Sequence, residues 1–186
     1  VPSEACTRRD IFLPAAHMAQ RTLHDYPQVS LKEEDIAGQL DFAHLFGRVG
    51  PVHIEIGCGK GTWLVAQARE HVDADYLGIE WANKYYRYAV DRVGRWGLSN
   101  VRIIRVDAAT FLRERVPEAS VDAFHIYFPD PWPKKKHHKR RFFWPPNVRR
   151  LLQCLKEGGR IQFVTDHPDY FAQAVWVAGG FLGWAE

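Results

Sequence analysis

The stretch PVHIEIGCGKG, residues 51–61, combines a short apolar run with a turn that contains three glycines. Residues 51–56 lie between Gly50-Pro51 and Gly57, which is typical of a buried strand. Gly57, Gly59 and Gly61 allow the backbone to turn sharply and to approach a ligand closely. Residues 62–71 then follow a helical pattern. A strand, a glycine turn and a helix in this order predict the first unit of a nucleotide-binding α/β fold.

The rest of the chain repeats this alternation of strand and helix. Further strands are predicted at 75–80, 100–107, 121–128 and 160–166, and helices at 83–96, from Pro145-Pro146 to Gly158-Gly159, and at 168–178. Such alternation with short links favours a Rossmann-like, doubly wound and mostly parallel sheet with helices on both faces. The predicted domains are an N-terminal arm with some helix, 1–48, and one α/β domain, 49–186.

Length and composition fit one globular domain in a reducing compartment. The chain has 186 residues, of which 46% are hydrophobic, and its three cysteines are Cys6, Cys58 and Cys154. No CxxC pair occurs, so neither a disulfide framework nor a zinc site is indicated. The longest uncharged stretch, 174–185, is too short to span a bilayer, and no leader pattern is evident. We therefore expect no membrane partner; the oligomeric state is not predicted.

Positive charge is concentrated in one segment. Nine of the 25 Lys and Arg residues lie between Pro131 and Lys156, where no acid occurs, which leaves 16 bases against 22 acids elsewhere. A basic segment on an otherwise acidic body indicates a polyanionic partner at one face. A solvated lysine-rich loop is the simpler alternative, but His137, His138 and several aromatic residues are interleaved with the charges.

Acidic residues lie at or directly beyond the end of each predicted strand. Glu55 lies near the end of the first strand, Glu80, Asp107 and Asp166 end their own strands, and Asp130 lies just beyond the strand at 121–128. Ligands of open α/β sheets bind beyond the carboxyl ends of the strands, and acids are unfavourable in strands and costly to bury unpaired. Any one of these acids is explained equally well by a helix N-cap or a salt bridge. The whole series indicates a functional site.

The glycine turn and the acids together indicate the ligand. A dinucleotide fingerprint requires G-x-G-x-x-G, but Thr62 takes the sixth position, and Lys60 is misplaced for a Walker loop. Glu80 is placed to accept hydrogen bonds from ribose hydroxyls, and Asp107 from an adenine amino group. Glu55 and Asp130 add negative charge. The expected cofactor therefore carries ribose, adenine and positive charge, which S-adenosylmethionine does.

With these motifs, the chain resembles the class I methyltransferases and, more narrowly, the bacterial tRNA (guanine-N7-)-methyltransferases. The resemblance covers roughly residues 50–178 and rests on EIGCGKG (55–61), YLGIEW (76–81), VDA (106–108), FPDPWPKKKHHKRR (128–141) and FVTDHPDY (163–170). It implies a cytoplasmic enzyme that makes 7-methylguanosine at position 46 of the tRNA variable loop and releases S-adenosylhomocysteine. The family's C-terminal T-x-[FY]-E segment is not found before Glu186.

The resemblance also implies roles for individual residues. Glu55, Glu80, Asp107 and Asp130 would contact the cofactor, beside the turn of Gly57, Gly59 and Gly61. Asp130 would be the catalytic residue. Lys134 and Asp166 would contact tRNA.

The chemistry of guanine N7 constrains what Asp130 does. N7 has a free lone pair and no proton, so the nucleophile needs no general base. We expect Asp130 to orient guanine through its N1–H or amino hydrogens and to stabilise the positive charge that develops on the ring. Asp166 would share this work. Phosphates would be bound by the basic residues that follow Asp130, and no metal is required; these basic residues are Lys134, Lys135, Lys136, Arg140 and Arg141.

Three other functions remain as alternatives. A methyltransferase for exocyclic adenine nitrogen shares a proline-aromatic turn after the fourth strand, but Asp130-Pro131-Trp132-Pro133 departs from that pattern. An RNA-binding module on a nucleotide-binding fold would bind tRNA without S-adenosylmethionine. A nicotinamide oxidoreductase is disfavoured by Thr62 and by the series of acids.

Overall fold

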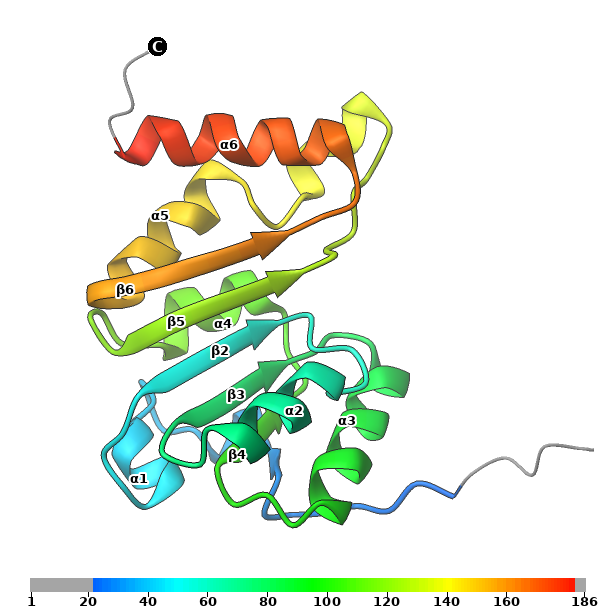
Figure 1. Cartoon of the computed structure of the whole chain (residues 1–186), viewed down its shortest axis with the longest axis vertical. Coiled ribbons are helices and arrows are strands. Elements are labelled where there is room, and N and C mark those ends of the chain that lie inside the picture. The colour runs from blue at the N-terminus through cyan, green and yellow to red at the C-terminus, as the bar shows by residue number, and fades with distance from the viewer. Residues whose placement is uncertain (1–21, 183–186) are drawn as a thin grey trace, which may run out of the picture.

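The computed structural model describes residues 22–182 and contains one sheet of six parallel strands (Figure 1). The order across the sheet is β1, β4, β3, β2, β5 and β6. The strand bounds are Ser30–Leu31 (β1), Val52–Ile56 (β2), Asp75–Ile79 (β3), Val101–Ile104 (β4), Val121–Tyr127 (β5) and Leu155–Val164 (β6). The predicted α/β fold class is confirmed. The strand order reverses beside β2, which is where such sheets bind ligands.

Helices cover both faces of the sheet. Figure 1 shows α2 and α3 on the near face and α4 and α5 on the far face, with α6 beside α5 and β6. The helix bounds are Phe42–Phe46 (α1), Thr62–Glu70 (α2), Asn83–Arg95 (α3), Ala108–Arg115 (α4), Pro145–Cys154 (α5) and Pro168–Leu182 (α6), with short 3-10 helices at Glu33–Asp35 (η1) and Lys135–Arg140 (η2). Within residues 22–182, no helix is both long and apolar enough to cross a membrane.

Alternation along the strands builds two hydrophobic cores. Ile54 of β2 and Phe124 of β5 pack into the larger core with Leu151 of α5. Ile103 of β4 packs into the second core with Leu64 of α2. Side chains of successive strand residues point to opposite faces, so the same strands supply both cores. These cores fix the carboxyl ends of the central strands relative to one another.

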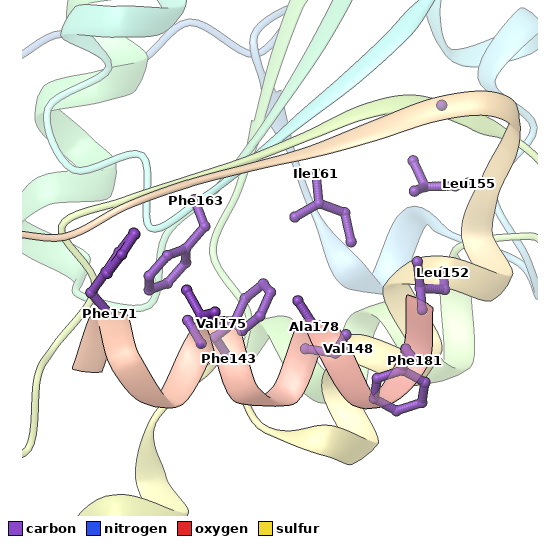
Figure 2. A pocket seen from close by; sticks show the side chains of 12 residues that line it. Phe143, Val148, Leu152, Leu155, Ile161, Phe163, Phe171, Val175, Ala178 and Phe181 are labelled. Atoms are coloured by element: carbon purple, nitrogen blue, oxygen red, sulfur yellow. The ribbon is translucent and has the colours of Figure 1, made fainter. Parts of the chain in front are cut away.

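A groove lined by apolar side chains lies between β6, α5 and α6. Figure 2 shows Phe143, Phe163 and Phe181 among the side chains that project into it. The rings of Phe143 and Phe163 are 4.7 Å apart, and Phe163 contacts the buried Tyr170 edge-on. The groove therefore continues the larger core towards the edge of the sheet.

Two elements differ from the prediction. Helix α4, which begins after Asp107, was not predicted; the Asp107 carboxylate accepts a hydrogen bond from the Thr110 N–H and so caps the helix. The helix that begins at Pro145 was expected to end at Gly158-Gly159, but α5 ends at Cys154. The glycine pair instead lies in β6, where the pairing with β5 is irregular and Gly158 has φ +76°.

Part of the predicted N-terminal arm joins the sheet. β1 pairs with β4, and Leu40 and Phe42 belong to the larger core. Residues 1–21 lie outside the described part of the chain. The division into an arm at 1–48 and a domain at 49–186 stays a prediction.

A substitution of Gly78 would measure how closely core side chains pack against β3. A Cβ at this position would lie 2.5 Å from Leu64 Cδ1 and 2.8 Å from Ile103 Cδ1. We expect Gly78→Ala to lower the free energy of unfolding by about 1–3 kcal/mol, measured by urea denaturation, because the core must shift to accommodate it. Gly180→Ala in α6 is the control: its Cβ meets nothing within 4 Å, and the change should be neutral or stabilising by up to about 1 kcal/mol. Equal effects of the two substitutions would contradict this packing.

Candidate functional site at the carboxyl edge of the sheet

A cavity of about 490 Å³ opens at the carboxyl ends of β2, β3 and β5. It brings together residues that are far apart in the sequence. Among the predicted site residues, those that line it are Gly57, Gly59, Glu80, Asp107, Asp130 and Arg140. The strand ends therefore converge on one site, as the doubly wound topology requires.

The three glycines of the turn have two different roles. All have positive φ, between +54° and +75°. At Gly57 and Gly59 a Cβ would meet nothing within 4 Å, so these residues leave open space beside the cavity. At Gly61 a Cβ would lie 3.2 Å from the Ala89 Cβ. Gly61 is buried and allows α2 and α3 to approach each other, so it shapes the turn without lining the cavity.

Glu80 holds the turn in place. Its Oε2 accepts a hydrogen bond of 2.9 Å from the Gly59 N–H, and its Oε1 accepts one of 2.7 Å from the Ala82 N–H. The N–H groups of Gly57 and Cys58 both donate to the Ile79 carbonyl. Glu80 is 9% exposed and lines the cavity. Each carboxylate oxygen has a second lone pair with which to accept a ligand hydroxyl.

Glu55 lies behind the cavity and is only 4% exposed. Within the described chain its Oε2 has no hydrogen-bond partner. Burial, and after it the nearby Glu80 carboxylate, raises the pKa of Glu55 to about 8. The free site therefore keeps Glu55 largely protonated at neutral pH. A cationic ligand beside it would supply the charge that lets this carboxyl ionise.

The FPDPW segment forms a strained lip over the cavity. Phe128 and Trp132 have φ values of +49° and +42°, a region that costs a non-glycine residue about 1–2 kcal/mol. The Phe128 N–H donates to the Val164 carbonyl, which fixes the start of the lip. Phe128 is 64% exposed, and Asp130 is exposed at the tip. This backbone conformation places the Phe128 ring and the Asp130 carboxylate beside the same cavity.

Arg140 is the part of the basic segment that reaches the cavity. Its guanidinium lies 4.9 Å from the centre of the Trp132 ring, a cation–π contact. Trp132 is half-buried and also meets the His137 ring edge-on. Lys134, Lys135 and Lys136 are exposed and lie outside the cavity lining. Asp166, at the end of β6, is also exposed and outside the lining.

Arg141 has a structural position, which corrects the expectation that it contacts a substrate. The residue is 1% exposed, and its guanidinium donates to the Pro131 carbonyl at 2.7 Å, to Gln173 at 2.6 Å and to Asp169 at 2.6 Å. It also lies over the Tyr170 ring. The Arg141 guanidinium holds the pKa of Asp169 below its usual range. Arg141 thus ties the lip to α6.

Two aromatic residues of the cavity, Trp81 and Tyr85, were not identified from the sequence as site residues. Trp81, directly after Glu80, is 68% exposed, and Tyr85 is 43% exposed; both line the cavity. Tyr85, Ala89, Val93 and Trp96 form a stripe at helical spacing in the predicted helix at 83–96, and of these Ala89 and Val93 are buried. Trp96 of the same stripe is exposed and is covered by the Arg69 guanidinium, 3.9 Å from its ring centre. Trp81 could have been identified from the sequence, because it is an aromatic residue directly after an acid at a strand end.

Residues 22–182 contain no group of three or more His, Cys, Asp or Glu side chains suited to hold a metal ion. The cavity instead presents carboxylates and two glycines with open space. These features fit an adenosine ligand with positive charge better than a polyphosphate, which the carboxylates would repel. The prediction that no metal takes part stays a prediction.

Comparison with known proteins gives consistent results. A family model described as "Putative methyltransferase" matches residues 49–181. The tRNA (guanine-N(7)-)-methyltransferase of Alkalilimnicola ehrlichii is 38% identical over 91% of this chain and 71% of its own length. The protein of the same name from Bordetella pertussis is 40% identical over 76% of this chain and 56% of its own length. That from Geobacter metallireducens is 33% identical over 89% of this chain and 79% of its own length.

Solved structures agree in fold. TrmN from Thermus thermophilus superposes with a TM-score of 0.54 at 23% identity, over 71% of this chain and 38% of that chain. A SAM-dependent O-methyltransferase from Thermotoga maritima superposes with a TM-score of 0.53 at 21% identity, over 84% of this chain and 51% of that chain. The fold is that of these proteins. Several of the curated relatives are longer, and this chain spans little more than half of their length.

Glu55 makes stability depend on pH. Its pKa is about 8 in the folded protein and near 4.5 when unperturbed, so stability is fully present below pH 4.5 and is lost as pH rises through about 8. We expect Glu55→Gln to remove this loss, so that the variant gains roughly 3–5 kcal/mol relative to the original protein between pH 4.5 and 8.5. Urea denaturation at a series of pH values measures it. Glu157→Gln, at an exposed position, is the control, and parallel curves for Glu55→Gln and the original protein would contradict the assignment.

Arg141 should matter for both stability and the lip. Arg141→Lys keeps the charge but loses the planar set of donors, and we expect the free energy of unfolding to fall by roughly 2–4 kcal/mol. Amide exchange at Phe128, Asp130 and Trp132 should accelerate in the same variant. Arg113→Lys, at an exposed ion pair, should change neither quantity. Unchanged exchange in the lip of the Arg141 variant would disprove the tie to α6.

Proposed function

The chain belongs to the family of tRNA (guanine-N(7)-)-methyltransferases, and from this premise we propose that it transfers a methyl group from S-adenosylmethionine to N7 of the variable-loop guanosine of tRNA. The observation that carries the proposal is the single cavity in which Gly57, Gly59, Glu80, Asp107 and Asp130 meet. These residues come from four segments of the chain, and residues of the strained FPDPW lip line the same cavity.

The acidic residues account for binding of the cofactor. When bound, S-adenosylmethionine supplies a methyl group on a positively charged sulfur. Glu80 would accept the ribose hydroxyls with its free lone pairs, and Asp107 would accept the adenine amino group beside α4. The open space at Gly57 and Gly59 admits the ligand close to the backbone. Glu55, whose Oε2 has no hydrogen-bond partner within the described chain, would balance the positive charge of the bound sulfur.

Asp130 would act on the guanine. N7 needs no deprotonation, so the carboxylate serves to accept the N1–H or amino hydrogens and to stabilise positive charge on the ring. Its exposure at the tip of the lip leaves the carboxylate accessible to a base that enters from solvent. Phe128, which is exposed in the same lip, offers a ring on which that base can stack. Asp166 would assist from the end of β6.

The basic segment would hold the tRNA backbone. Lys134, Lys135 and Lys136 are exposed, and Arg140 links this segment to the cavity through Trp132. Such contacts position a nucleic acid largely without reading its sequence, and binding should weaken steeply with salt. We place the reaction in the cytoplasm, in keeping with a tRNA substrate.

Asp130→Asn tests the assignment of the catalytic residue. Unmodified tRNA is incubated with the protein and labelled S-adenosylmethionine, and the nucleosides are analysed by mass spectrometry. We expect 7-methylguanosine from the original protein, and from the variant a kcat lower by roughly a hundredfold or more, because a charge-stabilising acceptor is lost.

Three outcomes separate the proposal from the alternatives. Near-normal kcat in the variant would exclude the role of Asp130. Label on adenosine, in a tRNA whose variable-loop guanosine is replaced by adenosine, would favour the other base. Binding of tRNA without binding of S-adenosylmethionine in calorimetry would favour a non-catalytic module.

A further inference from the structure

A second stretch of the chain is rich in bases besides the segment that follows Asp130. Residues 81–106 contain one acid, Asp91, and six bases, which are Lys84, Arg87, Arg92, Arg95, Arg102 and Arg105. Four of the six lie on α3, which begins just beyond the carboxyl end of β3. Figure 1 shows α3 beside α2, at the end of the molecule to which β2 and β3 point. The overall excess of acids outside residues 131–156 hides this stretch in the composition.

Half of these bases have partners within the fold. Arg95 pairs with the buried Asp91 at 3.0 Å, and Arg102 and Arg105 donate hydrogen bonds to backbone carbonyls. The other three form no ion pair and no side-chain hydrogen bond with any residue in the range 22–182; they are Lys84, Arg87 and Arg92. Lys84 and Arg87 are exposed, and Arg92 is half-buried. Packing of the fold therefore does not account for these three cations.

Helix stability does not account for all of them either. Lys84 lies in the first turn of α3, where the helix dipole disfavours a cation, and this turn contains no acid. Arg87 is three residues further on, so that the two like charges lie side by side on the helix and repel each other. Only Arg92, in the last turn, is favoured by the dipole. A bound anion would remove the repulsion between Lys84 and Arg87.

The unpaired cations form a continuous surface with an aromatic ring. Lys84, Tyr88 and Arg92 are spaced four residues apart, so they lie in a row along one face of α3 that is about 12 Å long. Lys60, from the glycine turn, is exposed, and its Nζ lies 5.5 Å from the centre of the Tyr88 ring. We call Lys60, Lys84, Arg87, Tyr88 and Arg92 the α3 surface.

The α3 surface begins at the candidate site. Tyr85, next to Lys84, lines the cavity at the carboxyl edge, as does Arg140 of the basic segment after Asp130. In the sheet, β2 lies between β3, which leads to α3, and β5, which leads to the lip. The cavity is therefore bordered by one basic region after β3 and by another after β5.

From this arrangement we propose that the α3 surface binds the ribose-phosphate backbone of the RNA substrate beside the cavity. That the polyanion is RNA rests on the proposed function. A nucleic-acid strand carries several phosphates over 12 Å, which matches the row of cations. Aromatic rings among cations are typical of surfaces that bind RNA, because bases stack on the rings while the cations bind phosphates. The substrate would thus be held on both sides of the target base.

The double substitution Lys84→Gln and Arg92→Gln tests the α3 surface. Binding of an unmodified tRNA transcript is measured by fluorescence anisotropy at a series of salt concentrations. We expect Kd to rise roughly tenfold at low salt, and the slope of log affinity against log salt concentration to fall by about one to two, because two phosphate contacts are lost. Binding of S-adenosylmethionine in calorimetry and the thermal midpoint should not change, since glutamine is a good helix former.

Two matched variants show whether charge at this place is what matters. Lys32→Gln with Arg113→Gln removes the same charge from exposed positions outside the α3 surface and should leave Kd within about twofold. Lys84→Arg with Arg92→Lys keeps both charges and should bind tRNA as the original protein does. Equal losses in the two glutamine variants would reduce the effect to net charge and overturn the proposal. So would unchanged tRNA binding in the α3 variant together with loss of its binding to phosphatidylglycerol vesicles, which would indicate a lipid partner.

The α3 surface and the methyl transfer can fail separately. Formation of 7-methylguanosine by the α3 variant with an unchanged KM for tRNA would overturn the surface and leave the proposed function intact. Weaker tRNA binding by the α3 variant, with no 7-methylguanosine from the original protein, would support the surface and contradict the proposed function. With both correct, the variant should show a higher KM for tRNA at an unchanged kcat, because the surface binds the substrate and the transition state equally.

Discussion

Two carboxyl groups at the ends of neighbouring central strands, Glu55 on β2 and Glu80 directly after β3, constrain the whole candidate site. Burial of Glu55, and after it the like charge of Glu80, oppose ionisation of Glu55 and raise its pKa to about 8. Glu80 remains bound to the Gly59 and Ala82 N–H groups and so anchors the glycine turn. The turn, the strand ends and the open space beside Gly57 depend on this arrangement. The same acidity that weakens the free protein at high pH suits a ligand with positive charge.

The two halves of the site rely on different physical devices. The cofactor side is built from regular structure: parallel strands that end at one edge, and a turn whose positive φ values glycine adopts without strain. The substrate side is an irregular lip in which Phe128 and Trp132 take positive φ without that freedom. Such strain persists only where the surroundings enforce it, and here Arg141 and the Val164 carbonyl do so. The preorganisation of Asp130 therefore derives partly from α6, far along the sequence.

Much of this could be predicted from the sequence because its signals were local. The run 51–71 specified a strand, a turn and a helix, and alternation specified a parallel sheet. Helix α4 was missed because Asp107 had been considered chiefly as a ligand contact, although an N-cap was one of its alternatives. The end of α5 was misplaced because Gly158-Gly159 is a good helix stop, yet tertiary pairing with β5 took the glycines into a strand. Arg141 could not be separated from Arg140 by composition, since only packing decides which of two adjacent arginines is buried.

Burial also explains why one face of the sheet carries polar residues. The far face of β2 and β5 is apolar where α4 and α5 cover it, and alternation then sends His53, Glu55, His125 and Tyr127 to the other face. α2 covers part of that face with Trp63, whose ring contacts His125 and Tyr127. Glu55 lies on the same face, and its charge contributes, after burial, to the raised pKa of Tyr127, which lines the cavity at the strand ends. Electrostatics therefore connect this polar strand face with the candidate site.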